Sequence, residues 1–221
     1  MKLSRRQMML SSLGAVGVVA AHGEALSQVC TGLTPQQPEG PFYPVDNQLD
    51  KDNDLTRVQN ITGKPKGQLI YVRGVISDHA CVPVAGALVE IWQACSSGKY
   101  NHKGDPNPAP IDPNFQYWGQ AVTDAQGRYM FKTILPGAYP ASSTWMRPPH
   151  IHYKVAKNGY RELITQLYFK GNDQLNAKDL ILQELSQADK AKVIVELTNA
   201  EQGYDPSGKI ATFNISLRKI G

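Results

Sequence analysis

Two histidines, His150 and His152, stand two residues apart in the segment RPPHIHYKV. The segment has a strand-like apolar pattern, and successive side chains of a strand point to opposite faces. Both imidazoles should therefore project from the same face. A single histidine beside an apolar strand is most often a hydrogen-bonded core or surface residue, but two on one face form half of a metal site.

Tyr100 in GKYNH and Tyr139 in PGAYP are candidate partners for these histidines. A phenol with a pKa near ~10 ionises at neutral pH only beside a strong cation, and a hard ferric ion is such a cation. Two phenolates and two imidazoles would leave Fe(III) with a single positive charge and able to bind a deprotonated catechol at an open position. The chain has ten tyrosines, and a buried tyrosine with a satisfied hydroxyl is the ordinary alternative.

Short strands separated by Gly/Pro turns must position these residues. The last predicted strand alternates Ala211, Phe213, Ile215 and Leu217 with polar residues, which indicates one buried face. The pattern predicts an all-β fold, an antiparallel β-sandwich with long active-site loops and one short helix, at about 176–190. The longest loop, 95–116, is of a length that is usually functional or disordered. The expected strands are 68–77, 86–93, 128–134, 149–157, 162–169, 192–197 and 208–218.

The N-terminal residues 1–27 have the features of an export signal: a basic start, an apolar run and small residues where a peptidase could cut. The Arg5-Arg6 pair resembles a twin-arginine signal, and an ordinary secretory signal is the alternative. The apolar run is shorter than the ~20 residues of a membrane span. We therefore expect a periplasmic or extracellular protein, with an extended arm at 28–67, a sandwich domain at 68–221 and no membrane segment after cleavage.

Composition excludes some classes of protein. The formal net charge is +4, of which Lys2, Arg5, Arg6 and Glu24 contribute +2, and no Lys/Arg cluster marks a nucleic-acid surface. An oxidising compartment would favour pairing two of the three cysteines. The pairing of Cys30, Cys81 and Cys95 stays open, although a Cys81–Cys95 bridge would require the chain to double back.

Longer motifs carry a family resemblance. The run DPNFQYWGQAVTDAQGRYMFKTILPGAYP, followed by RPPHIHYKV and LITQLYFKGN, resembles the intradiol ring-cleavage dioxygenases, and most of all the protocatechuate 3,4-dioxygenase subunits. The likeness extends from TPQQPEGPFYP to about Gly171. It implies a non-haem Fe(III) enzyme that uses O2 to cleave catechols between the two hydroxyl-bearing carbons, giving a cis,cis-muconate type diacid, with no organic cofactor.

The resemblance also implies roles for individual residues. Tyr100 and His150 match the equatorial iron ligands, and Tyr139 and His152 the axial ones. Arg147 matches an arginine that stabilises negative charge on the bound ring, and Gln166 a glutamine that supports it. Trp92 matches a pocket aromatic, although a core Trp is an equal alternative. Family members assemble from homologous subunits, with the arm near Gly40-Pro41 lining a pocket at an interface, so a homo-oligomer, a homodimer or larger, is expected.

Some features depart from the family, and two other classes of protein compete. Ala141 replaces a Trp that follows the axial tyrosine motif in the nearest relatives, and the helical N-terminal domain of catechol 1,2-dioxygenases has no counterpart. Parts of the chain also resemble transthyretin-like and carboxypeptidase-regulatory modules, which need no such ligand set. A Zn or Fe(II) site would combine the histidines with Asp105 or Asp112. A red-brown tyrosinate–Fe(III) colour would separate the three readings.

Overall fold

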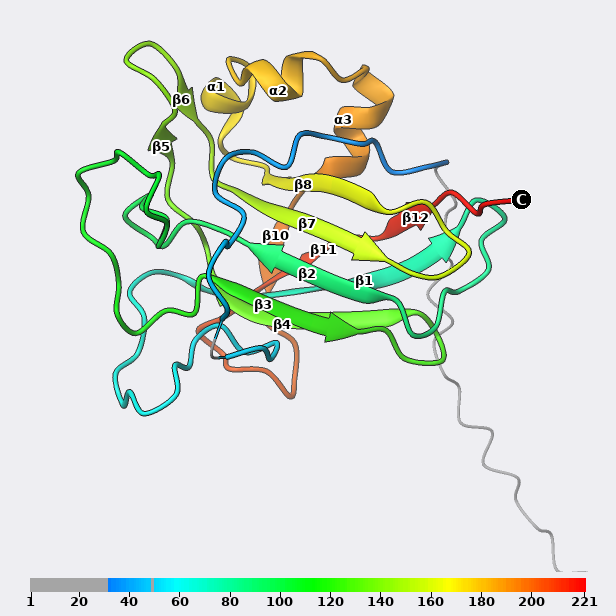
Figure 1. Cartoon of the computed structure of the whole chain (residues 1–221), viewed down its shortest axis with the longest axis horizontal. Coiled ribbons are helices and arrows are strands. Elements are labelled where there is room, and N and C mark those ends of the chain that lie inside the picture. Colours follow the sequence, from blue (N-terminus) through cyan, green and yellow to red (C-terminus); the bar gives the residue numbers. More distant parts are fainter. Residues whose placement is uncertain (1–31, 49) are drawn as a thin grey trace, which may run out of the picture.

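Two β-sheets pack face to face in the computed structural model, which describes residues 32–48 and 50–221 (Figure 1). The predicted all-β sandwich is thereby confirmed, whereas the predicted export signal and Cys30 lie outside the described residues. The first sheet contains, in order, β10 (Leu197–Asn199), β11 (Lys209–Thr212), β1 (Leu69–Asp78) and β12 (Ile215–Leu217), with β4 (Arg128–Ile134) also paired to β1. The second sheet has the order β3 (Trp118–Val122), β2 (Leu88–Trp92), β7 (His150–Ala156), β8 (Leu163–Phe169) and β9 (Ile194–Val195).

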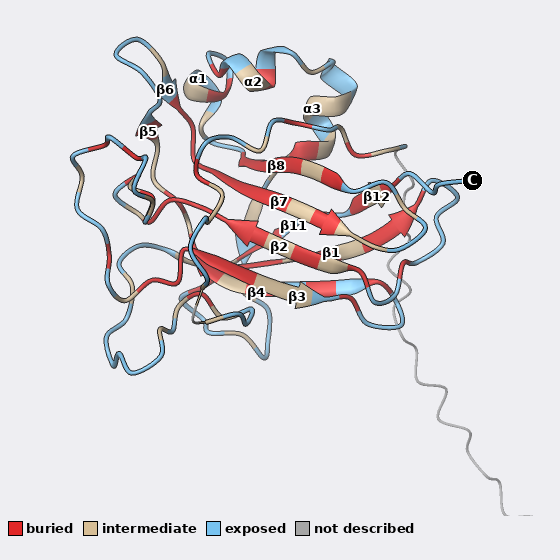
Figure 2. Cartoon of the chain, in the orientation of Figure 1, coloured by how far each residue is buried: buried red, intermediate tan, exposed pale blue. Residues whose placement is uncertain are grey.

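The main core lies between the inner faces of the two sheets (Figure 2). Phe213 and Leu217 are each 1% exposed, and their polar neighbours Thr212 and Asn214 are exposed, so the predicted alternation of this segment is confirmed. Tyr153 from the second sheet packs edge-on against Phe213, with ring centroids 5.1 Å apart. Burial of such large apolar side chains from both sheets holds the sandwich together.

Much of the outer face of the second sheet is also buried. In a sandwich the outer face of a sheet usually faces solvent. The N-terminal arm, 32–48, runs along this face (Figure 1). The Gln37 backbone N–H donates to the Ile164 carbonyl at 2.9 Å, and the Tyr43 ring packs edge-on against Trp92 at 5.0 Å. The arm therefore converts an outer sheet face into a second, water-poor interior.

Three short helices, α1 (Asp173–Asn176), α2 (Leu180–Gln183) and α3 (Gln187–Val193), replace the one helix predicted at 176–190, so that prediction was wrong. Asp179 and Ser186 have extended backbones, and each side chain accepts a hydrogen bond from the helix that follows it. Such N-cap residues start new helices rather than continue an old one. None of the described helices is long and apolar enough to cross a membrane.

The strand directions and some strand limits also differ from the prediction. β1 pairs in parallel with β11 and β12, and β8 pairs in parallel with β9, so the sandwich is not purely antiparallel. The helical segment 173–193 supplies the long connection that a parallel pair needs. The predicted strand 192–197 is divided because α3 extends to Val193, and the strand 208–218 is broken between Thr212 and Ile215. Strands β3, β5 (Tyr139–Pro140) and β6 (Met146–Arg147) were not predicted.

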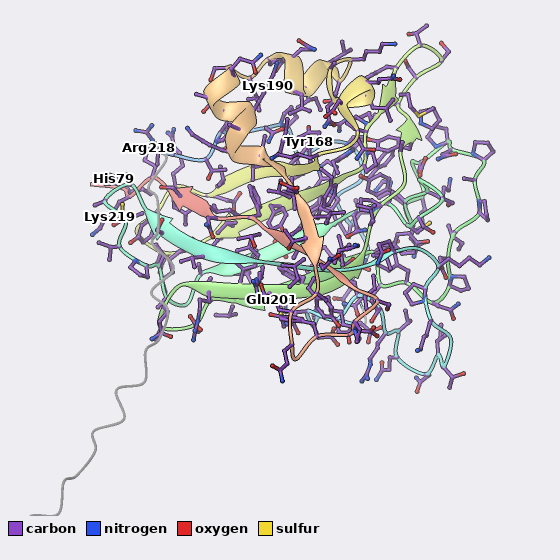
Figure 3. The ribbon with its side chains drawn as sticks, turned by 180° about the vertical axis from the view of Figure 1, so that it is seen from behind. His79, Tyr168, Lys190, Glu201, Arg218 and Lys219 are labelled. Carbon is purple, nitrogen blue, oxygen red and sulfur yellow. The ribbon has the colours of Figure 1, made fainter. Side chains whose placement is uncertain are left out.

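The structure excludes one of the cysteine pairings that the sequence left open. Cys81 is disulfide-bonded, whereas Cys95 is a buried free thiol whose Sγ lies 3.1 Å from Ser97 Oγ. A Cys81–Cys95 bridge is therefore not formed. Arg73 on β1 of the first sheet forms an ion pair with Glu201, with Nη2 and Oε1 2.7 Å apart. Glu201 is labelled in the view from behind (Figure 3).

Candidate active site

Cross-strand register on the second sheet gathers the first group of predicted site residues. His152 on β7 lies between Trp92 on β2 and Gln166 on β8, and His150 lies opposite Tyr168. Ile151 and Tyr153 point to the opposite, inner face, so the predicted common orientation of the two histidines is observed. The Trp92 indole stacks on the His152 ring with a centroid distance of 4.9 Å and an interplanar angle of 9°, which fixes the imidazole plane.

A small hairpin supplies the next two residues. β5 and β6 pair so that Tyr139 lies opposite Arg147. Residues opposite each other in an antiparallel pair project from the same face. Both side chains are buried, with 4% and 2% of their surfaces exposed, so this one pair of strands delivers a phenol and a guanidinium to one location.

The loop 95–116 brings Tyr100 to the same place. Asp105 Oδ2 accepts a hydrogen bond from the Tyr100 backbone N–H at 2.7 Å, and Asp105 Oδ1 accepts one from Asn107 N at 2.8 Å. Gly98 has a φ of 81°, and a Cβ there would stand 2.2 Å from the Ala138 carbonyl oxygen. Only glycine therefore lets the Tyr100 loop pass so close to the segment that carries Tyr139.

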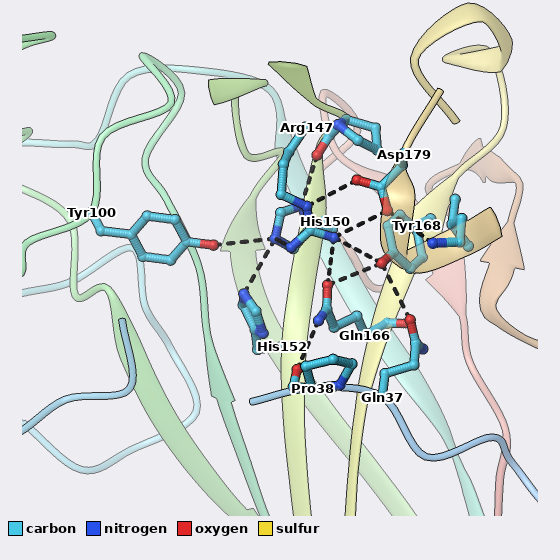
Figure 4. Close-up of polar contacts among 11 residues, drawn as sticks. Gln37, Pro38, Tyr100, Arg147, His150, His152, Gln166, Tyr168 and Asp179 are labelled. Atoms are coloured by element: carbon cyan, nitrogen blue, oxygen red, sulfur yellow. Dashed lines mark hydrogen bonds and ion pairs between the residues drawn. The ribbon is translucent and has the colours of Figure 1, made fainter. Parts of the chain in front are cut away.

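Polar atoms from these three elements converge on one point (Figure 4). His150 Nε2 lies 3.2 Å from His152 Nε2, 3.4 Å from Tyr100 Oη and 3.2 Å from Arg147 Nη1. The Tyr139 ring centroid lies 5.6 Å from that of His150 and 5.4 Å from that of Tyr100. The structure thus brings together all six residues predicted from the sequence, with Gln166 joined to Arg147 at 2.8 Å between Oε1 and Nη2.

The two imidazoles are held neutral. Burial, followed by the charge of Arg147, lowers the pKa of both His150 and His152 well below the ordinary value. His150 Nδ1 lies 2.7 Å from the Pro148 carbonyl oxygen, which can only accept, so Nδ1 carries the hydrogen and Nε2 presents its lone pair. This is the form in which an imidazole binds a metal ion.

The two phenols require a cation before they can ionise. Burial raises the pKa of Tyr100 well above its ordinary value, and the neighbouring Tyr139 raises it further. Burial also raises the pKa of Tyr139, although the charge of Arg147 opposes this effect. Phe42 from the arm packs on both rings, with centroids 4.7 Å from Tyr100 and 6.0 Å from Tyr139, and keeps water away from them.

The donor set fits a ferric ion. His152 Nε2 and Tyr100 Oη lie 3.2 and 3.4 Å from His150 Nε2, close enough together that one metal ion could be bound by all three atoms. Within the described ranges no three His, Cys, Asp or Glu side chains form a possible metal site, so a metal ion at His150 and His152 would need the two tyrosines as further ligands. Phenolates are hard oxygen ligands and suit Fe(III).

The alternative site with a carboxylate ligand is wrong, because both carboxylates are used elsewhere. Asp105 holds the Tyr100 loop, as described above. Asp112 Oδ2 accepts a hydrogen bond from the Lys66 backbone N–H at 2.7 Å, and Asp112 Oδ1 accepts one from Asn114 N at 3.0 Å. Both aspartates thus shape loops, and among the described residues neither is grouped with His150 and His152 in a possible metal site.

Sequence reasoning missed several residues around the site. Gly40 is not one of them, because the family resemblance places it at a pocket; a Cβ there would stand 3.2 Å from the His152 ring atom Cε1. Tyr168 accepts a hydrogen bond from Arg147 Nη2 at 2.9 Å, and Asp179 pairs with Arg147 Nε at 2.9 Å. The Trp145 indole lies beside the same guanidinium, with its ring centroid 5.4 Å from Cζ. The two-residue spacing of a strand places Tyr168 on the same face as Gln166, but no local signal marks Asp179.

Known proteins share both the sequence pattern and the fold. The sequence profile of the family described as "Dioxygenase" matches residues 38–219. A protocatechuate 3,4-dioxygenase beta chain from Burkholderia cepacia is 41% identical over 170 residues, which are 74% of this chain and 72% of the relative. A chlorocatechol 1,2-dioxygenase from a Pseudomonas species is 34% identical over 122 residues, but this chain covers only 46% of its length.

Solved structures agree with these relatives. The dioxygenase domain of a carbohydrate-binding fusion protein from Streptomyces sp. SirexAA-E has a TM-score of 0.62 and 29% identity, covering 85% of this chain and 99% of that domain. The 3-chlorocatechol 1,2-dioxygenase of Rhodococcus opacus has a TM-score of 0.65 and 25% identity, with 84% of this chain and 73% of that chain covered.

Proposed function

Because the chain belongs to the intradiol ring-cleavage dioxygenase family, we propose that it is a non-haem Fe(III) enzyme that cleaves catechol-type rings between the two hydroxyl-bearing carbons. Tyr100, Tyr139, His150 and His152 would bind the iron. The product would be a cis,cis-muconate type diacid that contains both atoms of O2. The observation that carries this proposal is the convergence of Tyr100 Oη and two neutral imidazole nitrogens on one buried point.

Bound Fe(III) would act as a Lewis acid that holds both catechol oxygens and makes the ring react with O2. The protein residues supply proton transfer, charge stabilisation and exclusion of water. Tyr139 Oη would accept a proton from a catechol hydroxyl, because an incoming catecholate competes with this phenolate for the cation. Arg147 would stabilise the negative charge that develops on the ring, and its burial among Tyr139, Gln166 and Tyr168 strengthens that effect.

A non-catalytic transthyretin-like or carboxypeptidase-regulatory module is the weaker reading. Such a module gives no reason for a buried guanidinium next to two neutral histidines and two buried phenols. Burying these polar groups costs free energy that a simple binding domain could avoid with apolar side chains. The buried polar groups on the outer face of the second sheet therefore favour a catalytic function.

The expected substrates are unsubstituted or 4-alkyl catechols rather than protocatechuate. Ala141, at the exposed tip of the β5–β6 hairpin, offers a small apolar side chain to a ring substituent. The nearest cation, Arg147, already has its charge balanced by Asp179. A ring carboxylate would thus find no unpaired cation among the residues described at this site.

We also propose that the protein is exported and assembles as a homo-oligomer. The disulfide at Cys81 supports export, because disulfides persist in oxidising compartments. The N-terminal residues 1–27 have the pattern of an export signal. The arm segment at Gly40 reaches His152, so any partner that contacts the arm would lie next to the site.

Purified, iron-loaded protein is expected to be red-brown and to consume one O2 for each catechol cleaved. A panel containing catechol, 4-methylcatechol and protocatechuate, scored by O2 uptake and by product mass, tests both reaction and substrate. Colourless protein that still contains iron, or yellow extradiol products, would contradict the assigned chemistry. A clear preference for protocatechuate would contradict only the substrate preference.

Replacing Arg147 by alanine is expected to lower kcat by about 100- to 1000-fold while the Kd for catechol changes less than about threefold. Chelation to iron supplies most of the affinity, and the guanidinium acts on charge that develops later. The variant leaves Asp179 buried without its cation, so rates are measured per folded, iron-loaded molecule. Arg128→Ala, which breaks an exposed ion pair with Asp124, is the matched control. Equal losses in binding and turnover would contradict a role in the transition state.

A further inference from the structure

We propose that Asp179, which no sequence motif marks, is the positioning residue that aims Arg147 at the substrate; this inference rests on the proposed function. Asp179 is 0% exposed and makes no hydrogen bond or ion pair with the four proposed iron ligands. Its partner in the site is the Arg147 guanidinium, with which it forms a two-oxygen contact (Figure 4). The hydrogen-bonded link from Asp179 to the site therefore passes through Arg147.

The hydrogen bonds of Arg147 divide its nitrogens into two groups. Nε donates to Asp179 Oδ2 at 2.9 Å. Nη2, which has two hydrogens, faces three acceptors: Gln166 Oε1 at 2.8 Å, Tyr168 Oη at 2.9 Å and Asp179 Oδ1 at 3.3 Å. These acceptors hold one side of the fork, and Nη1 remains directed at His150 Nε2, 3.2 Å away. Once His150 Nε2 binds a metal ion, the hydrogens of Nη1 become available to the substrate.

The contact of Asp179 explains why a bulky arginine has one orientation. Gln166 and Tyr168 lie on β8, next to β7, and both hold the guanidinium from the sheet side. Asp179 holds it from the opposite element, the helical segment that covers the sheet. A planar guanidinium held by acceptors on two elements has little freedom to rotate. Loss of the carboxylate should free the Nε side of the guanidinium.

Asp179 is itself fixed by the start of α2. Its backbone is extended, and Oδ1 accepts a hydrogen bond from Leu182 N at 3.0 Å, the usual contact of an N-cap. Leu182 is 1% exposed and packs in the main core. The carboxylate is thus anchored to the core of the protein, and it restrains the position of Arg147.

Charge gives Asp179 a second effect through the same contact. Burial alone lowers the pKa of Arg147, but Tyr168 and Asp179 raise it above the ordinary value, so the guanidinium stays charged. Asp179 also balances that charge. With Asp179 in place, the iron with two phenolates and the ion pair together carry one positive charge; without it they would carry two.

Asp179→Asn separates the two tasks of the carboxylate. The amide oxygen can still accept from Leu182 N, because Asn is as good an N-cap as Asp. The amide NH2 then replaces Oδ2 and presents hydrogens to Arg147 Nε–H, so Nε loses its acceptor while α2 keeps its cap. We expect kcat to fall about 10- to 100-fold, as for a misplaced catalytic group, with KM for catechol changing less than about threefold. Iron content and visible colour should stay at the wild-type level.

Ser186→Ala is the matched control for the helical segment. Ser186 caps α3 as Asp179 caps α2, with Oγ accepting from Asp189 N at 3.1 Å, but it makes no contact with Arg147. This variant should lower the thermal midpoint and leave kcat at the wild-type value. A loss of turnover in Ser186→Ala equal to that in Asp179→Asn would show that any weakening of the helices reduces activity, and would overturn the proposal.

The double variant Arg147→Ala/Asp179→Asn gives a readout that does not depend on activity. Arg147→Ala leaves a buried carboxylate without a cation, so adding Asp179→Asn should raise the thermal midpoint of the metal-free protein while lowering kcat no further. Additive losses of turnover, wild-type kcat in Asp179→Asn, or loss of iron from that variant would each overturn the role of Asp179. A wild-type protein that cleaves no catechol would instead contradict the proposed function, and with it this role.

Discussion

Alanine at His150 or His152 is expected to strip the iron from the protein and abolish ring cleavage. Each imidazole supplies one of two neutral nitrogens at the point of convergence, and both are fixed on the rigid strand β7. The neighbours of His152, the stacked Trp92 ring and Gly40, offer no replacement donor atom. Bound iron should fall below about a tenth of the wild-type content, because a site that loses a ligand loses much of its binding free energy.

Elemental analysis and the visible band of purified protein measure this loss. His79→Ala is the control: His79 is exposed and lies at the end of the sandwich that carries Arg218 and Lys219, away from Tyr168 (Figure 3). That variant should retain full iron and colour. Near-stoichiometric iron in both His150→Ala and His152→Ala would show that the proposed ligand set is incorrect. Circular dichroism checks that each variant keeps the β-sandwich.

Tyr139→Phe is expected to keep iron and colour but to lose turnover by about 100-fold or more, the usual size of a lost proton acceptor. Tyr100 remains as a tyrosinate ligand, whereas the group that would take a proton from the catechol is gone. The phenylalanine ring preserves the packing against Phe42, so the fold should be unaffected. Tyr100→Phe, in contrast, should weaken both iron binding and colour.

O2 uptake, iron content and the absorption spectrum together test this prediction. Tyr71→Phe is the control, because Tyr71 lies on β1 of the other sheet, where its hydroxyl accepts from Asp205 N at 3.2 Å. It should behave as wild type in turnover. Wild-type kinetics in Tyr139→Phe would contradict the role of Tyr139 as proton acceptor. Loss of all iron would show that Tyr139 is needed for iron binding rather than for proton transfer.

The local sequence determined most of the longer strands and the common face of the two histidines, but not the strands β3, β5 and β6. Alternation is a property of neighbouring residues, and a side chain two positions away must project from the same side of a strand. The same argument gave the buried set from Ala211 to Leu217. The importance of Tyr100 and Tyr139 came from the family resemblance, since spacing alone does not separate two tyrosines from the other eight.

Only the tertiary structure decided which segments meet. β1 runs parallel to β11 and β12, although alternation is identical in parallel and antiparallel strands. The predicted helix is divided because Asp179 and Ser186 cap new helices, and Leu180, inside the predicted range 176–190, is 57% exposed. Local propensity for a helix was overruled by the hydrogen bonds that these two side chains make.

The site itself depends on contacts between residues far apart in the sequence. Arg147 and Asp179 are separated by 32 positions, and Gln37 of the arm is separated by 131 positions from Tyr168, whose hydroxyl lies 3.2 Å from Gln37 Oε1. The sequence determined which chemical groups this protein has and which of them share a strand face. The packing of the arm and the helices over the second sheet decided that these groups are buried, neutral or paired, because burial and pairing depend on neighbours that only the folded chain supplies.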